Sequence, residues 1–189
     1  MNIFKSLSLT VLTIAALSSV AAHASVIGSL GSNPGGIAFV LTSSNVTGGL
    51  LTTGTSGNAT RPSNTIGAWL AGEPNSYGGS SVVSFVGGVS DVSFEWGTPD
   101  YYNTLIVGEA NGVTTNFTTS NLGIGGETYV NFVDTGSAIT SLTFDSQPAR
   151  SFEAANFTTT AVPEPASIAL LGLGLFGFAA ARRKSVNNK

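Results

Sequence analysis

The sequence predicts an all-β protein whose body is an antiparallel β-sandwich or jelly roll between two terminal signals. Short apolar bursts alternate with polar residues at a period of two, glycine-containing pairs separate them, and no helical period occurs between the ends. The 189 residues allow one domain plus terminal segments. We expect a secretory signal peptide over residues 1–24, a β body over residues 25–160 and a second signal over residues 161–189.

The N-terminal segment has the three parts of a secretory signal. Lys5 supplies the positive charge, residues 7–20 are apolar or small, and Ala22 and Ala24 occupy the −3 and −1 positions of a cut before Ser25. An anchor helix would need about 20 apolar residues, more than this segment has. We therefore expect export by the secretion machinery and cleavage by signal peptidase.

Cleavage limits the chemistry of the exported chain. It removes His23, the only histidine, and Met1, the only methionine, from a chain that has no cysteine. Catalysis by Ser–His or Cys–His pairs and zinc sites with His or Cys ligands are therefore excluded. We assign no catalytic residue and expect no enzyme. The remote alternative is a glycosidase, which needs only two carboxylates.

The body is strongly acidic. Residues 25–160 contain two arginines, no lysine and nine acidic residues, which gives a formal charge of −7. A chain with a pI of about 4.9 lacks the basic surface that binds phosphates, so we expect no nucleic-acid partner.

Strands are predicted wherever apolar residues recur in short bursts. Residues 91–96 read Asp-Val-Ser-Phe-Glu-Trp, a strand with one apolar and one polar face. About nine strands at this spacing are typical of a sandwich or jelly roll. The other bursts are residues 37–41, 66–70, 82–86, 105–107, 113–117, 129–133, 142–144 and 152–157, and the predicted turns lie at 48–49, 78–79, 87–88, 111–112 and 125–126.

The loop after the 91–96 strand is the candidate binding site. Tyr101, Tyr102 and Asn103 follow Pro99, which restricts the backbone of the loop. Exposed tyrosine rings would stack on the apolar faces of sugars, and buried ones would be core. The alternation of Trp96 with Phe94 favours burial of that tryptophan.

The same loop holds the best candidate for a metal ligand. Calcium binds carboxylate and carbonyl oxygens, which makes Asp100 beside Asn103 a weak calcium candidate, with Asp91 or Asp134 approaching in space. Otherwise we expect no cofactor.

The C-terminal segment combines a Pro-Glu-Pro motif, an uncharged stretch over residues 166–181 and a basic end. As a helix, this stretch would span about 24 Å, a marginal length for a membrane core of about 30 Å. These features resemble the PEP-CTERM sorting signal of exported proteins of Gram-negative bacteria. The same tail is also catalogued as an ice-binding-protein C-terminal segment, a label that does not imply ice binding.

The resemblance implies processing by an exosortase, a Cys-dependent transpeptidase in the inner membrane. It implies export across that membrane, a transient C-terminal anchor formed by a short transmembrane helix over residues 166–181, and release to the cell surface or extracellular matrix. The implied recognition residues are Pro163, Glu164 and Pro165, and the implied basic stop is Arg182, Arg183 and Lys184.

A second resemblance lies in the body. Residues 96–103 are similar to the Trp-Gly-Ser-x-Asp-x-Tyr-Asn pattern of some exosortase-dependent surface proteins, and residues 151–156 are similar to their closing Phe-Glu-x-Asp-Asn strand. Ala155 stands where an aspartate is usual.

Two functions remain open from the sequence. One is a structural or adhesive role in the exopolysaccharide layer of a biofilm. The other is a carbohydrate-binding module with its ligand site around residues 96–103. Exposure of Tyr101 and Tyr102 side by side would favour the second.

Overall fold

A computed structural model describes residues 25–33, 35–53, 59–72, 80–147, 149, 151–162 and 171–176. The predicted signal peptide, the Pro-Glu-Pro motif at residues 163–165 and the basic stop at residues 182–184 lie outside the described residues. Of the predicted signal-cleavage residues only Ser25 is described, as an exposed residue just before the first strand.

The body is built from strands that pair antiparallel throughout, so the prediction of an antiparallel β body is confirmed. One four-residue helix, α1, covers Thr119–Leu122. The strands are β1 Ile27–Leu30, β2 Ile37–Ala38, β3 Val46–Thr47, β4 Leu50–Thr52, β5 Trp69–Ala71, β6 Ser80–Trp96, β7 Thr104–Glu109, β8 Thr114–Thr118, β9 Thr128–Val133, β10 Ile139–Asp145 and β11 Glu153–Ala161.

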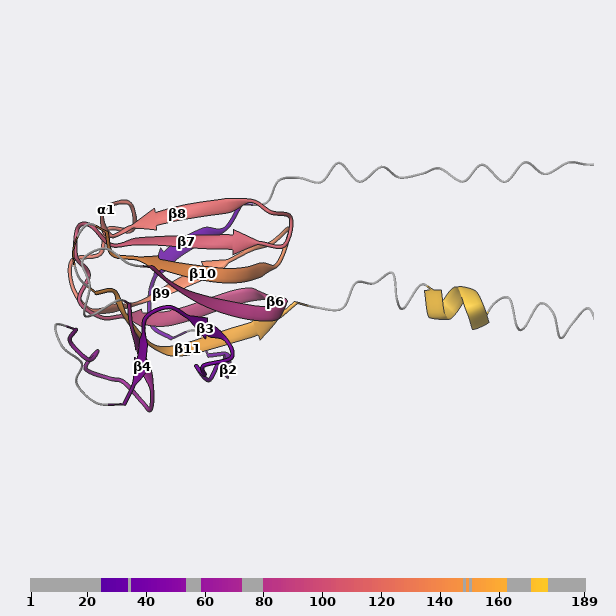
Figure 1. Cartoon of the computed structure of the whole chain (residues 1–189). Helices are drawn as coiled ribbons and strands as arrows, with labels where there is room; N and C mark the ends of the chain where they lie inside the picture. Colours follow the sequence, from indigo (N-terminus) through magenta and orange to yellow (C-terminus); the bar gives the residue numbers. More distant parts are fainter. Residues whose placement is uncertain are drawn as a thin grey trace, which may run out of the picture.

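All strands belong to one sheet that folds back on itself through β6. The first part of β6 pairs with β10 and β3, and its last part pairs with β9 and β11. The sheet continues through β7 and β8 on one side, and through β5 and β4 on the other. Figure 1 shows β8, β7 and β10 on one side of β6, and β11 with β2 and β4 on the other. This fold encloses one main core.

The predicted turn at residues 87–88 is wrong. Gly87 and Gly88 have φ angles of 82° and 75° inside β6, where they bend a continuous strand. Glycine adopts this left-handed region without steric cost. The bursts at residues 82–86 and 92–96 are therefore one long strand with a bend, which carries the chain from one part of the sheet to the other.

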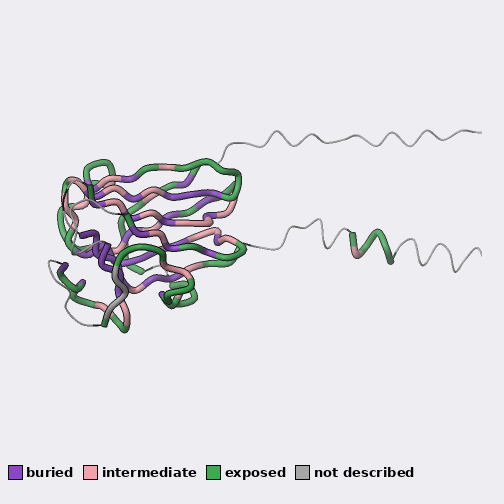
Figure 2. The backbone as a smooth tube through the Cα atoms, in the orientation of Figure 1, coloured by how far each residue is buried: buried purple, intermediate pink, exposed green. Residues whose placement is uncertain are grey.

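Aromatic rings fill the core between the two parts of the sheet. Phe94 lies at its centre, with ring centroids 5.1 Å from Phe157, 5.3 Å from Phe144 and 6.0 Å from Phe132. Figure 2 shows the buried residues concentrated in the strands and the exposed ones mainly in the connections. Trp96 is fully buried, as its alternation with Phe94 predicts.

The sheet is nearly closed because β1 packs close to β8. A Cβ atom at Gly28 would lie 2.7 Å from Cε1 of Phe117, so a larger residue at this position would have to displace the Phe117 ring.

The sequence did not predict the helix α1, which begins with a capping box formed by Thr118 and Asn121.

The C-terminal segment is described only at residues 171–176, which are helical and lie within the predicted 166–181 stretch. Within the described ranges, no helix has the length and apolar character needed to cross a membrane.

Candidate functional site

The outer face of the last part of β6 is covered. Sequence alternation placed Ser93 and Glu95 on a polar face, yet Ser93 is fully buried and Glu95 is only 2% exposed. The loop of residues 60–68 contacts Glu95 through Asn64, and a strap of residues 35–41 pairs with β11 beside this face. The Ser93 hydroxyl is hydrogen-bonded to the hydroxyl of Thr158, 2.6 Å away. The strap is attached to β11 by a hydrogen bond from the Phe39 N–H to the carbonyl of Phe157, 2.8 Å long.

A network of side-chain hydrogen bonds joins the 60–68 loop to the sheet. Asn64 Nδ2 donates to Glu95 Oε1 at 2.9 Å, and Asn156 Nδ2 donates to Glu95 Oε2 at 2.8 Å. Asn156 also binds the loop backbone, because its Nδ2 donates to the Asn64 carbonyl and its Oδ1 accepts from the Ile66 N–H, both at 2.8 Å. The buried Glu95 carboxyl therefore has partners on both of its oxygens.

Asn156 reaches this network because β11 contains a bulge. Ala155 pairs with Glu95 and Thr158 pairs with Ser93, so β11 holds one residue more than β6 over this interval. Asn156 has a φ angle of 52°, a left-handed conformation that asparagine tolerates better than most residues. The bulge turns its side chain toward the loop, as bulges commonly do beside functional sites.

Glu127 and Glu95 form a pair of neighbouring carboxyls, each of which shifts the pKa of the other. Burial raises the pKa of Glu95, and the neighbouring Glu127 raises it further. Burial also acts on Glu127, but hydrogen bonds from the hydroxyl and N–H of Ser63 outweigh it and lower the pKa of Glu127. When the pair holds a single proton, that proton is therefore favoured on Glu95 rather than on Glu127.

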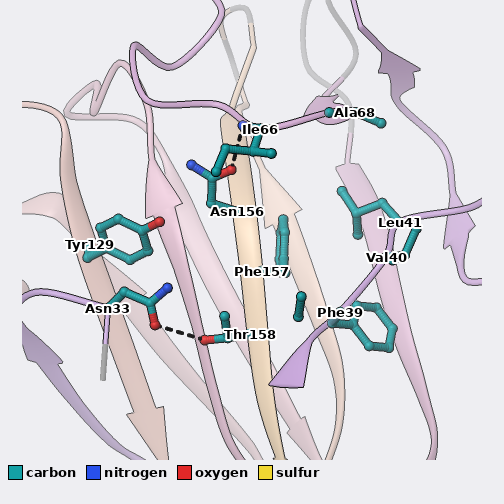
Figure 3. Close-up of a pocket in the computed structure, with 12 residues that line it drawn as sticks. Asn33, Phe39, Val40, Leu41, Ile66, Ala68, Tyr129, Asn156, Phe157 and Thr158 are labelled. Carbon is teal, nitrogen blue, oxygen red and sulfur yellow. Dashed lines mark hydrogen bonds between the residues drawn. The ribbon is translucent and has the colours of Figure 1, made fainter. Parts of the chain in front are cut away.

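A cavity of about 390 Å³ opens between the strap and the 60–68 loop, above the β11 bulge. Figure 3 shows Tyr129 and Asn33 on one side of it, Phe39 and Leu41 on the other, and Phe157 between them. The cavity is polar at the Tyr129 side and mainly apolar elsewhere. Its lining residues are Asn33, Ala38, Phe39, Val40, Leu41, Ile66, Gly67, Ala68, Tyr129, Asn156, Phe157 and Thr158.

Tyr129 is the titratable group that lines this cavity. Burial raises the pKa of its phenol, and the charge of Glu95 adds to the effect. The neighbouring side-chain amides of Asn156 and Asn33 act in the opposite direction without reversing the shift. The hydroxyl of Tyr129 therefore keeps its proton at neutral pH.

The predicted glycan loop presents one aromatic ring to solvent. Tyr101 is 89% exposed, whereas Tyr102 is partly buried and its hydroxyl donates to Asp100 Oδ2 at 2.7 Å. The two ring centroids are 5.2 Å apart with planes at 76°, so the rings meet edge to face. Burial raises the pKa of Tyr102, and the hydrogen bond to Asp100 raises it further. The rings do not form a common flat platform.

Asn103 differs from its predicted role as a glycan contact. It is fully buried, its N–H donates to the Asp100 carbonyl at 3.0 Å, and its Nδ2 donates to the Thr98 carbonyl at 3.3 Å. These contacts hold the loop from within. A buried side chain has no surface to offer a polysaccharide, so Asn103 is a loop-positioning residue.

Asp100 acts on Glu153, an acidic residue that the sequence analysis did not connect with it. Its charge helps to raise the pKa of Glu153, after the larger effect of burial. Asp134 accepts hydrogen bonds from the N–H groups of Gly136 and Ser137 in the turn before β10. In the part of the chain that the structure describes, no three or more His, Cys, Asp or Glu residues are grouped as a metal would require.

The structure brings together the two stretches of the body that resemble exosortase-dependent surface proteins. Trp96 pairs with Ala154, and the Gly97 N–H donates to the Glu153 carbonyl at 2.8 Å. Sequence reasoning missed the cavity and its network. The available signal was Asn156, because asparagine is unfavourable inside a strand unless a partner satisfies it. Glu95 gave no signal, because it occupies a polar position of an alternating strand.

Comparison with known proteins gives one family match. The model of the PEP-CTERM protein-sorting motif matches residues 161–184, which include the Pro-Glu-Pro motif, the uncharged stretch and the basic stop. No match was found among curated proteins or among solved structures. The chain therefore carries a PEP-CTERM sorting signal, which supports its export and its processing by an exosortase.

Proposed function

We propose that this protein is an exosortase-sorted surface protein with a structural or adhesive, non-enzymatic role in the exopolysaccharide layer. The observation that carries the proposal is the PEP-CTERM motif at residues 161–184, directly after the last strand of the body. Signal peptidase and exosortase would process the two ends. The folded β body would be the part that stays at the surface or in the matrix.

The carboxyl pair in the body supports a non-enzymatic role. Glycoside hydrolysis needs two carboxyl groups about 5–5.5 Å apart for retention, or about 6.5–9.5 Å apart for inversion. Glu95 is only 2% exposed, and its two oxygens accept hydrogen bonds from Asn64 and Asn156. This arrangement suits the attachment of a loop better than the binding of a sugar between two acids.

Sorting is tested by changing the motif. Replacing Pro163 and Pro165 with alanine should leave the protein uncleaved in the membrane fraction, because these residues are the implied recognition site. Pro99→Ala, outside the motif, is the matched control and should be released normally. Intact mass and cell fractionation give the result. Release of the double variant at the normal rate, or a mature protein that keeps Arg182 to Lys184, would contradict the sorting proposal.

The matrix role is tested by deletion. Cells that lack the protein should retain less exopolysaccharide at their surface, and the full chain should restore it. A chain with the altered motif should restore less, because the body then stays at the membrane. Equal matrix retention with and without the protein would refute the role and leave the sorting result untouched.

Carbohydrate binding by the 97–103 loop is the second candidate, and one observation favours it. The ring of Tyr101 projects into solvent from a loop that Asn103 and the Tyr102–Asp100 hydrogen bond hold in place. A rigid loop loses little entropy on binding. Tyr101→Ala should therefore weaken binding of polysaccharide from the producing cells, measured by co-sedimentation, whereas Tyr102→Phe should weaken it less.

A further inference from the structure

The cavity above the β11 bulge has features of a binding site that neither the sorting signal nor the 97–103 loop explains. Its volume of about 390 Å³ lies near the lower end of the range for small-molecule sites, roughly 300–1,000 Å³. It combines an apolar surface with a small group of polar side chains at one side (Figure 3). Such a combination fixes the orientation of a ligand that has both an apolar face and polar groups.

The polar side ends in an unused hydrogen-bond donor. A tyrosine hydroxyl can accept two hydrogen bonds and donate one. The phenol of Tyr129 lies beside Asn33 and Asn156. The Nδ2 group of Asn156 already donates to the Asn64 carbonyl and to Glu95 Oε2. Among the described residues, no acceptor receives the proton of the Tyr129 hydroxyl. In Figure 3 this hydroxyl points toward the space between Asn156 and Thr158, so a bound ligand would meet a donor there.

The charge beneath the cavity selects against anions. Glu95 lies close enough to Tyr129 to raise the pKa of its phenol, and a second carboxyl, Glu127, lies beside Glu95. The body as a whole carries a formal charge of −7 over residues 25–160. An anionic acceptor would be repelled, so the acceptor that suits Tyr129 is a neutral oxygen.

The apolar side favours a ligand with a flat hydrocarbon face. Phe39 and Phe157 contribute rings, while Val40 and Ile66 are exposed at 71% and 87%. The C–H face of a pyranose packs against such side chains, while its hydroxyl and ring oxygens accept hydrogen bonds. A plain acyl chain would cover the apolar part but leave the Tyr129 donor without a partner, at a cost in binding.

We propose that this cavity binds a neutral sugar unit, with one sugar face against Phe39, Val40 and Ile66 and one sugar oxygen accepting from the Tyr129 hydroxyl. The proposal goes beyond the surface role and needs neither exosortase processing nor the Tyr101 loop. A polysaccharide with neutral hexose units is the natural source of such a ligand for a matrix protein.

The test is calorimetric titration of the protein, isolated as its cells release it, with cellobiose, maltose, lactose and mannobiose. Glucuronic acid and octanoate serve as the anionic and acyl comparators. At least one neutral disaccharide should bind more tightly than both comparators. Tyr129→Phe removes the hydroxyl but keeps the ring, and it should weaken that binding about tenfold, the effect of losing one hydrogen bond.

Two further variants distinguish ligand binding in the cavity from ligand binding at the 97–103 loop. Ala68→Leu places a larger side chain at the cavity wall and should also weaken binding, while Tyr101→Ala should leave it unchanged. Circular dichroism checks the fold of each variant, and Tyr129→Phe decides the matter if Ala68→Leu unfolds. The proposal is overturned if no neutral disaccharide binds, if a comparator binds more tightly, or if Tyr101→Ala abolishes binding that Tyr129→Phe leaves intact.

Discussion

The two parts of β6 show different surroundings for the same alternating pattern. From Ser80 to Val86, buried and more exposed residues alternate, and Val86 is fully exposed. From Val92 to Trp96, every residue is buried, although polar and apolar residues still alternate. The glycine bend at residues 87–88 separates the two parts.

The difference arises from what covers the outer face. Near Val86 this face is open to solvent. Near Glu95 the 60–68 loop and the β11 bulge supply hydrogen-bond partners, Asn64 and Asn156. Period-two alternation thus identifies the face that meets the main core, but it does not show whether a distant segment covers the other face. The candidate cavity lies at the covered part, where buried polar groups require specific partners.

The largest expected effect comes from the inner face that both parts share. Phe94→Ala should lower the free energy of unfolding by about 3–5 kcal/mol, because it removes a ring at the centre of the aromatic core. Val86→Ala, on the exposed face of the same strand, should change it by less than about 0.5 kcal/mol. Urea unfolding measures both. Similar losses for the two variants would show that Val86 is covered in solution.

The next effect tests the covered outer face. Asn156→Ala should cost about 2–3 kcal/mol, because it leaves Glu95 Oε2 and the Ile66 N–H without their Asn156 partner and places alanine at a positive φ. Asn156→Gly loses the same hydrogen bonds but accepts the backbone conformation, so it should cost about 1 kcal/mol less. If both variants unfold at the same urea concentration as the parent, the network does not hold the loop.

The sequence predicted the inner face well and the outer face poorly, for a physical reason. The alternation of Val92, Phe94 and Trp96 is a local property, and it correctly placed all three in the core. The network at Glu95 joins residues about 30 and 60 positions away in the chain, Asn64 and Asn156. Such contacts depend on which strands pair and where a bulge shifts the register, and no local pattern encodes either.

The candidate site was predictable to a similar extent. The loop at residues 97–103 was identified from its composition, and the exposure of Tyr101 agrees with a surface role for that residue. The burial of Asn103 was not predictable, because it depends on the path that the loop takes around its own backbone. The terminal signals, in contrast, are read from order and spacing, and the C-terminal one matches its family model.

Buried carboxyl groups make the stability of the folded body depend on pH. Burial raises the pKa values of Asp91, Glu95 and Glu153 in the folded body, so folding favours their protonated forms. Their stabilising contribution is complete at pH values below the pKa values of the unfolded chain, which are 3.8 for Asp91 and 4.5 for the two glutamates. This contribution is lost as the pH rises through the higher pKa values of the folded protein. Glu127, with a lowered pKa, acts in the opposite direction.

We therefore expect the melting temperature to fall as pH rises above about 4.5, the ordinary glutamate value. Glu153→Gln removes one ionisable group that is only 3% exposed and should make this fall shallower. Asp145→Asn, at a site less buried than Glu153, is the matched control and should leave the slope unchanged. A melting temperature that rises between pH 4.5 and 7 would contradict the assignment of raised pKa values to these buried carboxyls.

The smallest expected effect concerns the two tyrosines of the 97–103 loop. Tyr102→Phe removes the hydroxyl that donates to Asp100 and should cost about 0.5–1.5 kcal/mol of unfolding free energy, the usual value of one hydrogen bond. Tyr101→Ala removes a ring that is 89% exposed and should change stability by less than about 0.5 kcal/mol. Urea unfolding of the two single variants separates a residue that holds the loop from one that is available to a ligand. If Tyr101→Ala proves the more destabilising of the two, its ring is packed in solution and the loop is structural.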